Sequence, residues 1–122
     1  MGLIRVADQS TTITPGANTA GTITLTGVPN KYHYILAIQA QRTCTITLAG
    51  TGSVNVTTTN VPGGPQWTLG NAMTAGATQI DINLSFAVPL RSSAPNTNTT
   101  FVFAQPGAAV GWNATVFYMI SD

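Results

Sequence analysis

Few side chains in this sequence could carry out chemistry, and their spacing does not group them. His33 is the only histidine, Cys44 is the only cysteine, and glutamate is absent, which leaves the scattered aspartates Asp8, Asp81 and Asp122. A protein metal centre needs several ligands, and glycoside hydrolysis needs a pair of carboxylates. We therefore expect no catalytic residue, no metal site and no cofactor.

The isolated reactive groups have structural interpretations. We expect His33 to be half-buried and bonded to a neighbouring backbone group. The position of Cys44 in an alternating run predicts core packing for its thiol. The chain has no GxSxG motif, and "GTGS" at 50–53 lacks the lysine of a phosphate-binding loop. The sequence does not indicate an enzyme.

Charge and composition narrow the remaining classes. Only 6% of the 122 residues are charged, against about 25% in an ordinary globular protein. The net charge of +1 argues against a nucleic-acid partner. No apolar run approaches the roughly 18 residues of a membrane span. The N-terminal "MGLIRVADQS" lacks a secretory apolar region, so we expect no signal peptide and synthesis in the cytoplasm. Four Asn-x-Ser/Thr sequons are expected to be unglycosylated, at Asn55, Asn83, Asn98 and Asn113.

The hydrophobic pattern predicts β-strands almost throughout, because apolar residues recur at every second position. Strands are expected at 3–6, 22–26, 32–41, 43–49, 53–57, 79–88, 100–104 and 112–120. No segment has a convincing helical period, and 70–78 could form one helical turn at most. Clusters of Gly, Pro and Asn separate the strands, as at 14–21, 61–65 and 92–98.

These elements predict a single all-β domain over residues 1–122, a β-sandwich of about eight strands with a jelly-roll or Greek-key layout. Residues 60–78 form a long loop between two groups of strands, and residues 1–12 form either an attachment arm or a first strand.

The run "KYHYILAIQAQRTCTITLAG" (31–50) reads as two strands joined by "QRT". In its first half Tyr32, Tyr34 and Leu36 alternate with His33 and Ile35, so that both faces are largely apolar. This pattern predicts a central strand that is covered on both sides, by loops or by another subunit. In 79–88 the alternation sends Ile80 and the following apolar residues one way and Asp81 the other.

The two tryptophans have different predicted roles. Trp112 follows the inward alternation of the last strand and is assigned to the core. Trp67 lies in the proline-rich "VPGGPQWTLG" and either plugs one open end of the sandwich or anchors another chain. An almost uncharged β-domain has little to guard its strand edges, so we expect self-association or assembly with other proteins.

The whole chain, rich in Thr, Asn, Gly and Ala, ends in "GWNATVFYMISD", where Val116 and Tyr118 lie in a Gly-led final strand. In its composition and its final strand, the whole chain resembles the cement or decoration proteins of tailed-bacteriophage capsids. The resemblance implies a homotrimeric jelly roll that sits on the virion surface and bridges subunits of the major capsid protein, with no nucleic-acid or membrane partner.

An alternative is a carbohydrate-binding or host-adhesion module of a phage head fibre or tail tip, in which Trp67 or Tyr32 stacks on a sugar. For the structural role, attachment is expected through the N-terminal segment 2–12 and the loop 61–69. The contact residues predicted there are Leu3, Ile4, Arg5, Val6, Pro62, Pro65 and Trp67.

Overall fold

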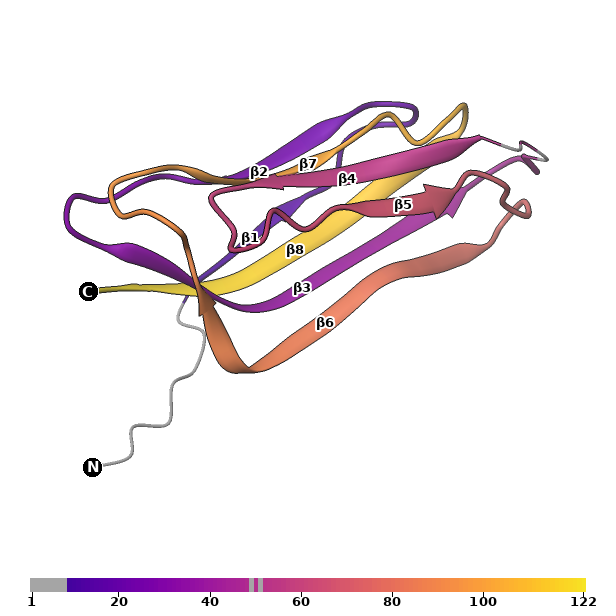
Figure 1. Cartoon of the computed structure of the whole chain (residues 1–122). Coiled ribbons are helices and arrows are strands. Elements are labelled where there is room, and N and C mark those ends of the chain that lie inside the picture. The colour runs from indigo at the N-terminus through magenta and orange to yellow at the C-terminus, as the bar shows by residue number, and fades with distance from the viewer. Residues whose placement is uncertain (1–8, 49, 51) are drawn as a thin grey trace.

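Every regular element of the described residues is a β-strand, as the period-two patterns predict. Figure 1 shows the computed structural model, in which the structure describes residues 9–48, 50 and 52–122. Its strands are β1 (Gln9–Ile13), β2 (Gly21–Leu25), β3 (Tyr32–Cys44), β4 (Ser53–Thr59), β5 (Trp67–Gly70), β6 (Thr78–Arg91), β7 (Thr99–Phe103) and β8 (Val110–Ser121).

The strands form two four-stranded antiparallel sheets, which lie one above the other in Figure 1. The lower sheet has the order β1-β8-β3-β6, and the upper sheet has the order β2-β7-β4-β5. The antiparallel pairs include β1 with β8, β2 with β7, β3 with β6, and β4 with β5. This is the pairing of one long hairpin that is rolled into two layers. This is a jelly roll, and the predicted all-β sandwich is confirmed.

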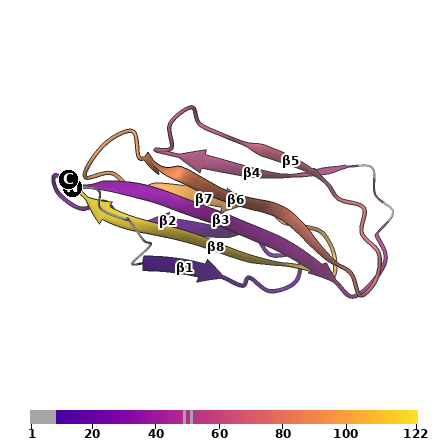
Figure 2. The ribbon, with the colours of Figure 1, turned by 90° about the horizontal axis from the view of Figure 1, so that it is seen from below.

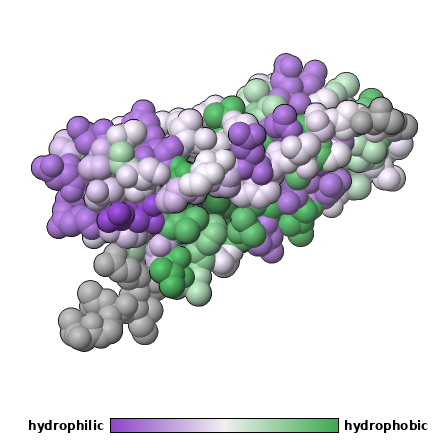
Figure 3. All heavy atoms as spheres, in the orientation of Figure 1, coloured by the Kyte–Doolittle hydropathy of each residue, from purple (hydrophilic) through white to green (hydrophobic). Residues whose placement is uncertain are grey.

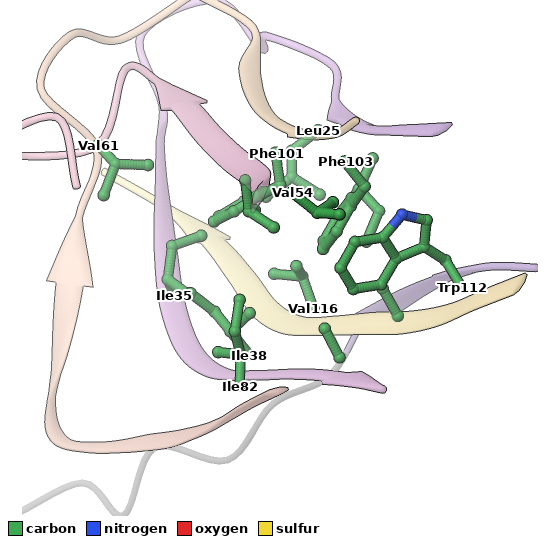
Figure 4. Close-up of a cluster of buried hydrophobic side chains, with 14 residues drawn as sticks. Leu25, Ile35, Ile38, Val54, Val61, Ile82, Phe101, Phe103, Trp112 and Val116 are labelled. Atoms are coloured by element: carbon green, nitrogen blue, oxygen red, sulfur yellow. The ribbon is translucent and has the colours of Figure 1, made fainter. Parts of the chain in front are cut away.

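The core lies between the two sheets, which each contribute alternate side chains. Phe101 and Phe103 of β7 are fully buried and face Ile38 of β3 and Val116 of β8 across the interior (Figure 4). Trp112 is 2% exposed, which confirms its assignment to the core, and its indole N–H donates to the carbonyl of Ala104 at 2.8 Å.

The first difference from the predicted strands is in β3. The expected break at "QRT" is wrong, because β3 runs without interruption from Tyr32 to Cys44. The assignment of its faces changes at a β-bulge between Ile35 and Ala37. Before the bulge His33 and Ile35 point inward, and after it Ile38 and the alternate residues that follow do so. The extra residue moves the alternation to the other face, which explains why both faces looked apolar.

A second register shift corrects the predicted faces of β6. Ala40 is opposite Ile82, whereas Gln41 is opposite Ile80, so Asp81 is the extra residue in this strand. The Asp81 side chain is therefore directed inward and is 0% exposed, and Ile80 is turned outward and is 68% exposed. This is the reverse of the predicted arrangement at these two positions.

Three other predicted boundaries are wrong. The predicted strand at 43–49 is not present in its described part, 43–48. Thr43 and Cys44 end β3, and among 45–48 a ladder contact is made by Leu48, which forms an isolated bridge with Met73. The region 60–78 is not a continuous loop, because β5 lies within it. Strand β1 overlaps the segment 1–12, for which a first strand was one alternative, but its bounds were not predicted, because "QSTTI" has too few apolar residues to show an alternation. The predicted strand at 3–6 lies outside the described residues.

Candidate interaction surface

The predicted contact residues of the 61–69 loop lie together at the connection between β4 and β5. Pro62 is exposed, and the carbonyl of Pro65 accepts a hydrogen bond from the Thr58 hydroxyl at 2.8 Å. Trp67 opens β5, where its half-buried side chain packs against the core cluster. Trp67 thus covers part of the core from β5, an edge strand of the upper sheet.

The other predicted contact residues, Leu3, Ile4, Arg5 and Val6, lie outside the described residues. The part of the predicted attachment segment that the structure describes begins at Gln9. From there the chain enters β1, which pairs with β8 at one edge of the lower sheet.

His33 is held in a closed hydrogen-bond network. It is 3% exposed, and its Nε2 donates to the backbone carbonyl of Thr26 at 2.9 Å. Its Nδ1 lies 2.7 Å from the hydroxyl of Thr99, which also accepts a hydrogen bond from the Asn60 amide at 3.1 Å. The expected backbone bond is present, although the residue is buried rather than half-buried. Both ring nitrogens have structural partners, so nothing in this arrangement presents His33 to a substrate.

Cys44 packs in a small second cluster with Met73 and Val110, which agrees with the predicted core position. The thiol is buried and donates to the carbonyl of Thr74. Among the described residues, no group of three or more His, Cys, Asp or Glu side chains could hold a metal ion.

A buried ion pair that was not predicted from the sequence joins β3 to β6. Arg42 Nε lies 2.6 Å from Asp81 Oδ2, and Arg42 Nη2 lies 2.9 Å from Oδ1, so the guanidinium grips the carboxylate with two parallel bonds. Both side chains are 0% exposed. The same guanidinium donates to the carbonyl of Gly70 and lies 5.5 Å from the ring centroid of Trp112. One feature of the sequence could have indicated this pair: Arg42 and Asp81 are opposite charges in two predicted strands that carry almost no other charge.

The exposed charges of the described residues gather at one end of the molecule. Lys31 forms an exposed ion pair with Asp122, which follows the last strand. The Arg91 guanidinium stacks on the ring of Tyr32, with 4.5 Å to the centroid. Figure 3 shows the deepest purple at this end, where the C-terminus lies. Since the remaining charged pair is buried, the rest of the described surface has no charged side chain.

An apolar rim follows β6, which forms the edge of the lower sheet opposite β1 (Figure 2). Ile80, Leu84 and Val88 are 68%, 38% and 80% exposed, and we call these three side chains the β6 rim. Green side chains gather along this strand in Figure 3. Strand β6 pairs with β3 alone among the described strands, so one side of its backbone has no strand partner. Edge strands usually carry lysine or other charges that prevent pairing with other chains, and the β6 rim has none.

No protein-family model matches the chain, and no curated protein or solved structure matches it. In the part of the chain that the structure describes, no helix is long and apolar enough to cross a membrane.

Proposed function

We propose that this chain is a structural protein of a virus particle, a capsid decoration protein without enzymatic activity that self-associates and reinforces the shell by bridging coat subunits. The observation that carries the proposal is the β6 rim. An edge strand with three exposed aliphatic side chains, whose exposed charge is confined to Arg91 at its last position, is suited to pairing or packing with another protein.

The distribution of charge supports this role. The centres of protein interfaces are depleted in charged residues, because charges lose hydration when a partner covers them. Here the described charges are either buried together or confined to the end formed by Lys31, Arg91 and Asp122. Thr, Asn, Ser and Gln side chains cover most of the remaining surface and can be buried against a protein at lower cost.

Reinforcement of a shell needs more than one contact per molecule. A standard interface buries roughly 1,600 Å² in total, and several such attachments on one oligomer raise the effective affinity further. The β6 rim provides the contact between copies. The N-terminal segment, with Leu3, Ile4, Arg5 and Val6, and the loop with Pro62, Pro65 and Trp67 provide the contacts to the major capsid protein.

The direct test compares particles that carry this chain with particles made without it. We expect particles without the chain to release their genome at a lower temperature, and re-addition of the purified protein to restore the original value. Equal survival of the two kinds of particle under heat and osmotic shock would contradict the cementing role.

Imaging separates this role from that of an adhesion module. Electron microscopy of labelled protein should place it over the whole capsid surface, in many copies. A label found only on a head fibre or at the tail tip would instead favour the alternative of host adhesion.

A further inference from the structure

The outward face of the lower sheet has a hollow beside the β6 rim, with which it shares the side chain of Ile80 and no other. Its volume is about 380 Å³, within the range of small-molecule sites in proteins. Side chains of the three adjacent strands β3, β6 and β8 line it. We call this hollow the amide groove, after the residues Gln39, Gln41, Asn83, Asn113, Thr115 and Ile80.

Strand register arranges these side chains in two neighbouring rows. In one row Asn83, Gln39 and Thr115 lie side by side, and Thr12 of β1 extends it. With an interstrand spacing of about 4.8 Å, the row across four strands is about 14 Å long. In the other row Gln41 lies between Ile80 and Asn113. The second row owes its aliphatic side chain to the bulge at Asp81, which turns Ile80 outward.

The amide groups of the groove have hydrogen-bonding capacity that the protein leaves unused. Within the described residues, the side chains of Gln39, Gln41, Asn83 and Asn113 have no hydrogen-bond partner, whereas the Thr115 hydroxyl pairs with that of Thr12 at 2.8 Å. Each amide offers two N–H donors and an acceptor oxygen with two lone pairs. The groove therefore presents many donors and acceptors at fixed spacing and no charge.

We propose that the amide groove binds a neutral oligosaccharide. Sugar hydroxyls donate and accept hydrogen bonds, as the four amides do, and the C–H face of a pyranose ring can pack on the exposed aliphatic side chain of Ile80. The lining has no cation to hold a phosphate or carboxylate and no carboxylate to hold a metal ion. A protein partner would need an apolar anchor at the centre of its contact, whereas the apolar residues of this sheet edge lie mainly along the β6 rim.

The test is a two-dimensional NMR titration of the uniformly ¹⁵N-labelled chain with separate neutral hexasaccharides: cellohexaose, laminarihexaose, maltohexaose, mannohexaose and chitohexaose. At least one should shift the side-chain NH₂ signals of Gln39, Gln41, Asn83 and Asn113. Asn83→Ala and Asn113→Ala should each weaken binding of that sugar about tenfold, which corresponds to about 1.4 kcal/mol. Asn55→Ala, at an exposed asparagine on β4 of the other sheet, should leave binding unchanged.

Three results would overturn the inference. One is the absence of shifts with all five sugars. Another is binding that Asn83→Ala and Asn113→Ala do not weaken, although their spectra show folded protein. The third is equal or tighter binding of hexagalacturonate, which would show that the ligand class is not neutral. The inference is independent of the proposed role in the particle. Asn83→Ala should lose affinity for the sugar and still attach to particles as well as the unchanged protein does.

Discussion

At the scale of single residues, Arg42 and Asp81 are the groups whose removal has the clearest consequence. The guanidinium holds the carboxylate with two bonds, reaches the carbonyl of Gly70 at the end of β5, and lies over Trp112. It thus connects the lower sheet to the end of the upper one. A buried charge is tolerable only with its partner in place, because the interior cannot replace the lost water.

Asp81→Ala should therefore lower the free energy of unfolding by about 3–5 kcal/mol, because it leaves the Arg42 guanidinium buried without its counter-charge. Urea unfolding at neutral pH measures the change. The double variant Arg42→Met with Asp81→Leu should recover most of the lost stability, since it removes both charges and keeps an apolar filling.

The exposed ion pair provides the matched control for that experiment. Lys31 and Asp122 have side chains that are 40% and 84% exposed, so Asp122→Ala should change stability by no more than about 1 kcal/mol. If Asp81→Ala lowers the free energy of unfolding as little as Asp122→Ala does, the buried ion pair does not contribute to stability as we expect.

At the scale of elements, β6 differs most from an ordinary edge strand. It is 14 residues long and pairs on one side only, with β3. Its register breaks at Asp81 and again between Ser85 and Leu90, where Val88 projects into solvent. Bulges of this kind bend an edge and can discourage pairing, but here they also turn aliphatic side chains outward.

Val88→Lys should weaken self-association of the purified chain at least about tenfold, because a charge at an edge opposes pairing with a second copy. Sedimentation velocity over a concentration series measures the change. The residue is 80% exposed, so stability should stay within about 0.5 kcal/mol of the original.

Val102→Lys is the matched control, since Val102 is also exposed but lies on β7, an interior strand of the other sheet. It should leave self-association unchanged. If both lysines weaken self-association equally, the effect comes from the added charge and not from its position. If Val88→Lys does not weaken self-association, β6 is not part of the interface between copies.

At the scale of the whole molecule, the position of the charges determines which forces can drive assembly. Apart from one end, the described surface carries no charged side chain, so contacts elsewhere rest on apolar burial and neutral hydrogen bonds. Such contacts are screened little by salt, because salt acts on exposed charges.

Self-association should therefore change less than about twofold between 50 mM and 500 mM NaCl, a range over which charge-driven contacts weaken strongly. Sedimentation equilibrium at both salt concentrations measures this. A large loss of association at high salt would place the contact at the charged end near Lys31, Arg91 and Asp122 instead of at the β6 rim.

Much of the fold could be predicted without coordinates. The alternation in 22–26, 53–57 and 112–120 is a local property of extended backbone, and Gly, Pro and Asn mark the turns through their own conformational preferences. The core position of Trp112 followed from the same alternation. The scarcity of charge was equally evident, whereas the protein neighbours that it led us to expect stay a prediction.

Only the tertiary structure decided how the two faces of each strand are used. The bulges after Ile35 and at Asp81 arise from pairing with strands far away in the sequence, and each one reverses the alternation beyond it. They bring Asp81 to Arg42 and turn Ile80 outward beside the amides of β3 and β8, while the strand order of the sheet leaves β6 at an edge. Local sequence specifies that a strand forms, whereas the partner strand decides which of its side chains are buried and which remain available for binding.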